Sequence, residues 1–329
     1  MSTFKEAFEL EKVGPSTFKG IHPLKKPIPE ARGAYGGNIA GQAVLVGMRT
    51  VPDGFSPNSF HSLFVKGVLD QIPMVWEVEE NSNGRNFCSR TIRGIQDGKV
   101  RYIVEISFTK NNSLKQAEIN HQNYLNKKVQ QAAERSGKEV DDEDDDELDD
   151  LVQKPFYFLT PYPEWLKEAT EDDLIRKEDT PLFLDHKFPR QFVSLKGTEY
   201  EEEIAPSERR MSYFGRIGDG TTKLESPDLQ YVAVAVISDA VFLAELARVF
   251  RVRKENLKPY FSVSLDHHMY FHDTDFDCTD WIGFAFRAVR FVNNRVLLEA
   301  EMYNSDGQHF ATIFQEGLVH LNGLLDSKL

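Results

Sequence analysis

The sequence predicts an α+β protein made of two similar halves, each an antiparallel sheet wrapped around one mostly apolar helix. Both halves contain the same order of segments, which is a helix, then strands of alternating polarity, then a hairpin. Each hairpin turns at an Asp-Gly pair, a strong short-turn signal, and Asp97 and Asp306 are 209 residues apart (306 − 97). A parallel doubly wound sheet would need a helix after every strand, so this order of segments excludes it.

In the first half, a helix rich in small residues precedes the strands. The helix is expected over residues 35–48, the first strands over 60–66 and 75–79, and the hairpin over 86–95 and 99–109. This helix is apolar nearly all round, which is what a helix enclosed by a sheet requires.

The second half repeats this order with a longer apolar helix. The helix is expected over about 228–250, the strands over 261–271 and 282–291, and the last hairpin over 295–303 and 308–320. An alternative makes residues 231–237 a strand and lets one acid, Asp239, cap a shorter helix.

A polar connector separates the two halves. We expect an N-terminal domain over residues 1–112, a connector over 113–180 and a C-terminal domain over 181–329. The first part of the connector, residues 115–135, can form a helix, and residues 139–150 then hold ten acids and no base. Such dense like charges normally stay solvated. Without this run the net charge changes from −13 to −3 (−13 + 10), so neither nucleic acid nor an anionic membrane is an expected partner.

The composition is typical of a globular protein with a substantial core, at 40% hydrophobic and 12% aromatic residues. No apolar run approaches the roughly 18 residues of a membrane span, and the N-terminus is too polar for a secretory signal. The only cysteines, Cys88 and Cys278, form no metal or disulfide pattern. The sequence contains neither a phosphate-binding glycine loop nor a Gly-x-Ser-x-Gly motif, which excludes an α/β-hydrolase.

The last three residues, Ser327, Lys328 and Leu329, form the S-K-L signal for import into the peroxisomal matrix. By average residue usage, this tripeptide would end a chain by chance only about once in a few thousand sequences. We therefore expect a peroxisomal protein that binds the import receptor through this signal.

Three polar residues lie in segments that otherwise have the composition of apolar core, namely Asp239, Ser264 and Gln315. Burying such a group without a partner costs about 1–3 kcal/mol, so its presence invites a functional explanation. Shifting the second hairpin by 209 residues places Gln315 over Ile106, so the second half carries an amide where the first is apolar. Two structural alternatives remain, in which Asp239 is a helix N-cap and Gln315 a solvated strand residue.

Several polar residues would share one face of the strand that follows Ser264. Asp266, His268, Tyr270 and His272 are spaced for this, as in a metal site. Because zinc usually takes its ligands from separate segments, we favour a hydrogen-bonded network that braces the strand and the helix, and we expect no bound metal. His61 and His268 are also candidates to contact a substrate.

A series of short motifs runs through both halves. In chain order, these motifs are Leu10-Glu11-Lys12-Val13, Phe18-Lys19-Gly20, Tyr35-Gly36-Gly37, Gly41-Gln42-Ala43, Ser59-Phe60-His61-Ser62-Leu63-Phe64, Ile237-Ser238-Asp239, Ser264-Leu265-Asp266-His267 and Gln315-Glu316-Gly317. In this order they resemble the type II, TesB-like acyl-CoA thioesterases, including peroxisomal members. The resemblance covers most of the chain apart from the connector and the extreme ends. It implies a double hotdog fold, hydrolysis of acyl-CoA and no cofactor.

The resemblance also implies a catalytic trio of Asp239, Ser264 and Gln315. Asp239 would take a proton from a water molecule that Ser264 and Gln315 hold in place, with no covalent intermediate. The sequence departs from the family in its long acidic connector and in the aspartate-rich stretch 273–280. These departures concern the binding of coenzyme A more than the chemistry.

Coenzyme A carries phosphates that need cations. Arg85 and Arg90 are candidates, as are Arg209 and Arg210, and the sequence does not rank them. We expect a peroxisomal enzyme that converts fatty acyl-CoA to free fatty acid and coenzyme A. The alternatives are a non-catalytic acyl-CoA-binding protein and a hotdog enoyl-CoA hydratase or dehydratase. Two hotdogs in one chain form the usual pair, and a homo-oligomer of the chain is compatible with this.

Overall fold

The computed structural model describes residues 3–110, 112–136, 155–179, 182–191, 195–240, 246–251 and 261–320. The acidic run and the C-terminal import signal lie outside these residues. Among the helices that are described, none is both long and apolar enough to cross a membrane.

The N-terminal half follows the predicted order of segments. Its elements are α1 (Phe4–Ala7), β1 (Leu10–Gly14), β2 (Thr17–Gly20), α2 (Gly36–Met48), β3 (Ser56–Phe64), β4 (Val75–Asn83), β5 (Phe87–Gln96) and β6 (Lys99–Thr109). The predicted turn between β5 and β6 is confirmed, because Asp97 and Gly98 both have positive φ, at 50° and 67°. A two-residue hairpin turn requires this backbone conformation.

The C-terminal half repeats this order with a shorter central helix than predicted. Its elements are β7 (Leu174–Asp179), β8 (Leu184–Pro189), β9 (Met211–Ile217), α7 (Pro227–Ser238), α8 (Leu246–Val249), β10 (Phe261–Ser264), β11 (Asp266–Phe271), β12 (Ile282–Val292), β13 (Arg295–Tyr303) and β14 (His309–His320). The helix predicted over 228–250 ends at Ser238, and Asp239 is its C-cap. The apolar pattern continues past this point, so periodicity did not show the end. Residues 231–237 are helical, so the alternative strand is wrong.

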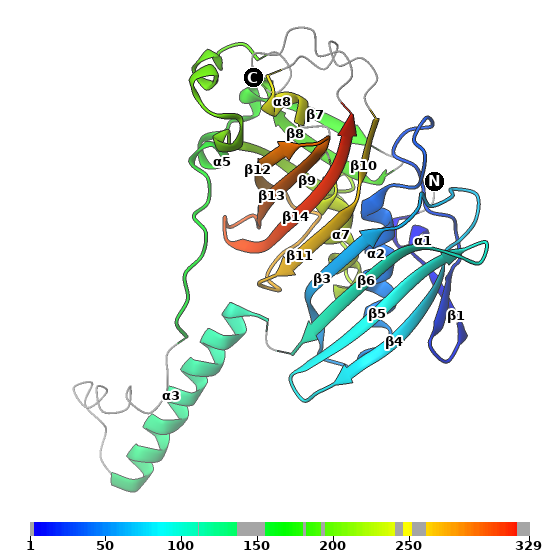
Figure 1. Ribbon diagram of the computed structural model, residues 1–329. Coiled ribbons are helices and arrows are strands. Elements are labelled where there is room, and N and C mark those ends of the chain that lie inside the picture. The colour runs from blue at the N-terminus through cyan, green and yellow to red at the C-terminus, as the bar shows by residue number, and fades with distance from the viewer. Residues whose placement is uncertain are drawn as a thin grey trace.

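Between the halves, α3 (Leu114–Ser136) extends away from the body of the molecule. An extended segment then returns to the C-terminal half at α5 (Glu164–Glu168), as Figure 1 shows. The stretch predicted to be able to form a helix, residues 115–135, coincides with α3.

The strands form one antiparallel sheet, in the order β1-β2-β4-β5-β6-β3-β11-β14-β13-β12-β9-β8-β7, with β10 paired to β14. The two halves meet where β3 pairs with β11, and His61 lies opposite His268 in this pair. The sheet curls around α2 and α7 (Figure 1). The predicted arrangement of an antiparallel sheet around a helix in each half is therefore confirmed, with the two sheets joined into one through the β3–β11 pair.

Helices α2 and α7 lie side by side, and glycines allow their close approach. A Cβ on Gly37 would lie 2.6 Å from the carbonyl oxygen of Val236, and one on Gly41 would lie 3.1 Å from that of Val232. A larger residue at either position would push the helices apart. Nearly every residue of α2 is buried, and so is α7 from Tyr231 onward, as their apolar composition predicted.

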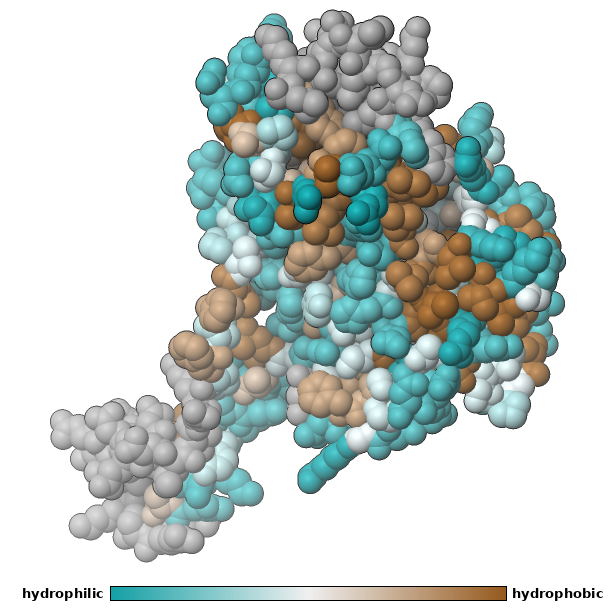
Figure 2. Space-filling view, in the orientation of Figure 1, coloured by the Kyte–Doolittle hydropathy of each residue, from teal (hydrophilic) through white to brown (hydrophobic). Residues whose placement is uncertain are grey.

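Hydrophobic side chains gather on part of the outer face of the sheet, over β3 and β6 (Figure 2). Leu63 and Val65, at the end of β3, are 54% and 46% exposed. Between them, the Phe64 ring comes within 3.0 Å of where a Cβ on Gly36 would lie. An exposed apolar surface therefore lies beside the N-terminus of α2.

Candidate active site

Asp239, Ser264 and Gln315 meet at one point, although 76 residues separate the acid from the amide in the chain. The side-chain amide nitrogen of Gln315 donates to Oδ1 of Asp239 at 2.7 Å and to Oγ of Ser264 at 2.6 Å. Asp239 follows α7, Ser264 ends β10, and Gln315 lies within β14. The structure thus brings together all three residues that the sequence singled out.

Asp239 lies where the C-terminus of α7 meets the N-terminus of α2. Its Oδ2 accepts a hydrogen bond from the backbone N–H of Gly37 at 2.8 Å. A Cβ on Gly36 would lie 2.7 Å from the same oxygen, so the site has no room for a larger residue there. The positive end of the α2 dipole favours a negative charge at this position. Asp239 is thus a C-cap that reaches the other helix, and the N-cap alternative is wrong.

Burial makes the Asp239 carboxylate easier to protonate than an ordinary aspartate. Its side chain is 8% exposed. Burial raises its pKa to about 7, although hydrogen bonds from Gln315 and Gly37 act to lower the pKa. A carboxylate with a pKa near neutrality can take a proton and return it at physiological pH.

Ser264 faces the helices because its strand is interrupted one residue later. Ser264 lies opposite Gly317, whereas His268 lies opposite Phe314, so the register against β14 shifts by one residue between them. A shift of one residue exchanges the faces on which the following side chains lie. The single strand predicted over 261–271 is therefore two strands, β10 and β11, and the break directs the serine hydroxyl toward Gln315.

Gln315 is fully buried on the helix-facing side of β14, so the alternative of a solvated strand residue is wrong. Ile313 and Val319 on the same face are buried and apolar, and so is Ile106, the predicted counterpart in the other half. The Gln315 amide nitrogen bonds both other members of the trio. Its Oε1 is buried without a hydrogen-bond partner among the described residues. A water molecule or a polar group of a substrate can satisfy this acceptor.

His267 lies beside the trio, and the sequence analysis assigned it no role. Its Nδ1 is 4.0 Å from Oδ1 of Asp239, and its Nε2 is within 3.0 Å of the Ser238 hydroxyl. Its ring stacks on Phe60. Burial lowers the pKa of His267 to about 4, so the ring is neutral at pH 7. Because of the break between β10 and β11, His267 faces the helices and His268 faces outward. No sequence pattern showed that break.

His61 and His268 lie on the outer face of the sheet, with the sheet between them and the trio. Their Nδ1 atoms are 2.9 Å apart, and Nε2 of His268 is 3.5 Å from Oδ2 of Asp266. Asp266 also accepts the backbone N–H of Glu316 at 2.7 Å. These contacts form a hydrogen-bonded network as predicted, but it links β3, β11 and β14 on the outer face and does not brace the strand against the helix. Within the described ranges, no group of three or more metal-type ligands is found. Contact of either histidine with substrate stays a prediction.

Arg90 and Arg85, predicted to contact phosphates, lie away from the trio. Arg90 is buried in β5, and its N–H groups all donate within the protein, mostly to backbone oxygens. It has no donor left for a phosphate. Arg85 is exposed in the turn before β5, at the end of β3 that starts with Ser56. The trio lies near Phe64 at the other end, roughly 26 Å away along a nine-residue strand.

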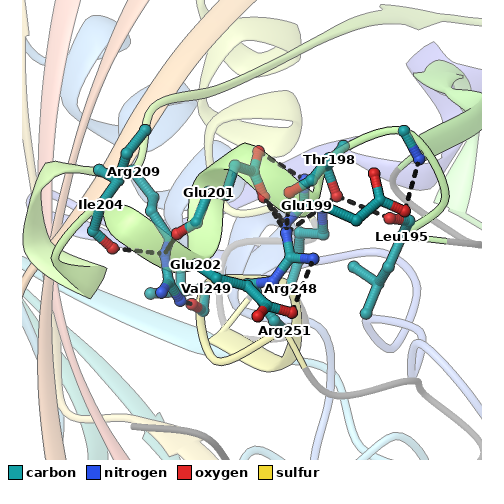
Figure 3. A network of polar contacts seen from close by, with 11 residues as sticks. Leu195, Thr198, Glu199, Glu201, Glu202, Ile204, Arg209, Arg248, Val249 and Arg251 are labelled. Carbon is teal, nitrogen blue, oxygen red and sulfur yellow. Dashed lines mark hydrogen bonds and ion pairs between the residues drawn. The ribbon is translucent and has the colours of Figure 1, made fainter.

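Arg209 belongs to a buried polar network in the C-terminal half (Figure 3). It donates to three backbone carbonyls, those of Glu201, Ile204 and Val249. The Glu201 carboxylate pairs with Arg248 at 2.6 Å and with Arg251 at 2.9 Å. This network fastens the segment before β9 to α8. Arg210 lies outside it and forms an ion pair on the sheet. The geometry therefore gives structural roles to Arg90 and Arg209.

Two family models match the chain, one in each half. The model described as the acyl-CoA thioesterase N-terminal domain matches residues 24–110, and the model described as the acyl-CoA thioesterase C-terminal domain matches residues 179–319. All three residues of the trio lie within the second match.

Relatives with curated descriptions match over nearly the whole chain. Peroxisomal acyl-coenzyme A thioester hydrolase 1 of Saccharomyces cerevisiae is 26% identical, over 97% of this chain and 95% of that protein. Acyl-coenzyme A thioesterase 8 of Homo sapiens is 25% identical, over 95% of this chain and 87% of that protein.

Among solved structures, the acyl-CoA thioesterase II TesB2 from Mycobacterium marinum superposes with a TM-score of 0.68 at 20% identity. The superposition covers 97% of this chain and 98% of that one. A hotdog-fold protein from Alicyclobacillus acidocaldarius gives a TM-score of 0.66 at 16% identity, over 97% and 98% of the two chains. These likenesses agree with the double hotdog that the motifs implied. The chain therefore belongs to the acyl-CoA thioesterase family, in its type II group, and is an acyl-CoA thioester hydrolase.

Proposed function

We propose that the chain hydrolyses fatty acyl-CoA to free fatty acid and coenzyme A, with Asp239 as the general base for one water molecule. The observation that carries this proposal is the single Gln315 amide that bonds both the buried acid and the Ser264 hydroxyl. Fixed hydrogen bonds of this kind remove much of the orientational entropy from the barrier. The unpartnered Oε1 of Gln315 supplies an acceptor for the water molecule itself.

In the proposed step, the water oxygen bonds to the thioester carbonyl carbon while Asp239 takes one water proton. The carbonyl oxygen becomes an oxyanion, which the N-terminal end of the α2 dipole favours. The carbon–sulfur bond then breaks, and Asp239 returns its proton to the departing sulfur. The products are a fatty acid and a free thiol, and the protein ends the cycle unchanged.

The rival reactions would use the same side chains differently. A hotdog hydratase or dehydratase needs a His–Asp type pair, and His267 does lie beside Asp239. In this protein, however, the ring of His267 is fully buried, bonded to Ser238 and stacked on Phe60. These contacts suit a residue that positions the acid. A non-catalytic acyl-CoA carrier would need no carboxylate with a raised pKa.

Release of free thiol from palmitoyl-CoA tests the proposal directly. We expect one equivalent of thiol and one of palmitate for each palmitoyl-CoA consumed. An enoyl-CoA of the same length, assayed for addition of water to the double bond, gives the matched test of the hydratase alternative. Hydration without thiol release would overturn the proposed function, and binding without turnover of either substrate would favour the carrier.

We also propose that the protein resides in the peroxisomal matrix. The S-K-L signal of Ser327, Lys328 and Leu329 supports this, as does the name of the yeast relative. A fluorescent protein fused to the N-terminus should coincide with a peroxisomal marker and become diffuse when these three residues are deleted. An unchanged distribution would reject import through this signal. Light scattering by the purified chain would test whether it forms a homo-oligomer.

A further inference from the structure

A large cavity lies at the other end of the α2–α7 pair from Asp239. It has a volume of about 1000 Å³, within the range typical of ligand pockets. Its walls come from the C-terminus of α2, the N-terminus of α7, the start of β3, the first turns of α3 and the loop after β11. All residues that line it belong to the part of the chain that the structure describes.

The register of the sheet relates the two ends of the molecule by an approximate two-fold axis. Phe60 lies opposite Ile106 in the β3–β6 pair. In the β11–β14 pair, His268 lies opposite Phe314, so the same register places His267 opposite Gln315. His267 is thus the counterpart of Phe60, and Gln315 the counterpart of Ile106.

The central helices obey the same relation. Asp239 is the C-cap of α7 and contacts the N-terminus of α2. Arg49 is the C-cap of α2 and lies 3.5 Å from Asp228 at the N-terminus of α7. Asp228 and Met48, the residue that precedes Arg49, both line the cavity. The cavity therefore occupies the place in the first half that the trio occupies in the second.

This end of the molecule lacks the groups that would cleave a thioester. An arginine stands at the position of Asp239, and apolar Ile106 and Phe60 stand at the positions of Gln315 and His267. At these positions, among the described residues, no amide holds a carboxylate, although Gln230, which lines the cavity, donates to Asp277 at 3.2 Å. A ligand that enters the cavity is therefore bound without being hydrolysed.

The lining of the cavity suits a long acyl chain, and its charged groups are one cation, Lys110, and two carboxylates, Glu225 and Asp228, of which Asp228 is paired with Arg49. Phe55, Met48 and Phe276 supply apolar surface. The Lys110 ammonium lies 4.9 Å from the centre of the Phe55 ring and lines the same cavity. The Tyr231 hydroxyl is buried there without a well-formed hydrogen bond among the described residues. Apolar walls with a few polar groups are typical of sites for amphipathic ligands.

We propose that this cavity is a second, non-hydrolytic site for a fatty acyl ligand, either a free fatty acid or an acyl-CoA. The choice of ligand rests on the proposed function, since it follows from the two-fold relation to the acyl-CoA site. The acyl chain lies between Met48, Phe55 and Phe276, and Lys110 binds the carboxylate or a phosphate. Helix α3 forms one wall through Gln116 and neighbouring residues.

Equilibrium binding to the full chain tests this site. The probes are S-hexadecyl-coenzyme A, a thioether that cannot be hydrolysed, and palmitate below its micellar concentration. We expect two molecules of the thioether per wild-type chain and one per Ala117→Trp chain, because Ala117 lines the cavity from the exposed face of α3. Gln122→Trp, on the same helix but outside the lining, is the matched control and should still bind two.

Lys110→Glu should weaken binding at this second site by roughly tenfold, whereas Lys127→Glu on α3 should not. If Ala117→Trp abolishes saturable binding of palmitate, the free acid is a ligand of this cavity. If Ala117→Trp abolishes only the binding of the second thioether molecule, the ligand is acyl-CoA. A single site for both probes in the wild-type chain, or no effect of Ala117→Trp, would overturn the proposal. Palmitoyl-CoA hydrolysis by Ala117→Trp is measured in parallel. If the wild-type chain hydrolyses palmitoyl-CoA but has only one binding site, the second site is refuted and the proposed function stands. If the wild-type chain does not hydrolyse palmitoyl-CoA but has two binding sites, the proposed function is refuted and the second site stands.

Discussion

The two ends of the α2–α7 pair share one framework and differ in a few side chains. At one end, the C-cap of α7 is Asp239, and Gln315 holds it from the facing strand. At the other end, the C-cap of α2 is Arg49, and the strand offers Ile106. The backbone arrangement therefore does not distinguish the end proposed to be catalytic from the other end. The two ends differ chemically because only one of them carries a carboxylate, an amide and a hydroxyl on the duplicated backbone framework.

The largest effect should come from removing the base. Asp239→Asn keeps the shape of the side chain but cannot accept a proton from water, so kcat should fall by about 10²-fold or more. Thiol release from palmitoyl-CoA measures this effect. Circular dichroism and thermal unfolding provide the control for folding, and near-normal turnover by a folded variant would reject Asp239 as the base.

A second variant would replace Gln315 by isoleucine, the residue found at the matching position, Ile106, in the first half. Gln315→Ile removes the amide that holds both Asp239 and Ser264, so kcat should fall by roughly tenfold to a hundredfold. Because the Gln315 hydrogen bond lowers the pKa of Asp239, its loss should raise that pKa further. The rise of kcat with pH should then move from near pH 7 to higher pH. Ile106→Val at the other end is the control, and an unchanged pH profile in Gln315→Ile would contradict the role of the amide.

The stability of the protein should depend on pH through Asp239. The folded-state pKa of Asp239, about 7, exceeds the ordinary 3.8, so the folded protein binds this proton more tightly than the unfolded chain. Its contribution to the free energy of unfolding is complete below about pH 4 and is lost as the pH rises to about 7. Asp239→Asn avoids this loss, so its melting temperature at pH 8 should exceed that of the wild type. The gain should vanish near pH 4, and a constant difference across this range would contradict the buried, easily protonated acid.

The smallest effect on stability and on kcat is expected from a change at Arg49, the C-cap of α2. Arg49 is 56% exposed in its ion pair with Asp228, and exposed pairs contribute about 1 kcal/mol or less. Arg49→Gln should therefore change the free energy of unfolding by no more than this and leave kcat unaltered. Urea unfolding and the thiol assay measure the two quantities. A large fall in kcat would show that the two ends are coupled more tightly than the comparison supposes.

Much of this protein followed from local patterns in the sequence. The order of segments, the turn at Asp97-Gly98 and the apolar helices depend on neighbouring residues, so composition and period revealed them. The trio was singled out because polar residues stood where an apolar strand or helix was expected, and because the motifs that contain them resemble those of the family. The sequence did not show that α7 ends at Ser238. It also did not show that all the N–H groups of Arg90 would donate hydrogen bonds within the protein.

By itself, the sequence determined the duplicated α+β architecture, since turn preference, periodicity and polarity act over short stretches of chain, and the resemblance of its motifs to a family singled out Asp239, Ser264 and Gln315 as candidates for the chemistry. Only the tertiary structure decided how these side chains are used. The register shift after Ser264, the inward face of His267 and the close approach of Gly37 to Asp239 depend on contacts between segments far apart in the chain. The raised pKa of Asp239 and the cavity at the opposite end depend on them too, because burial exists only once the two halves have packed together.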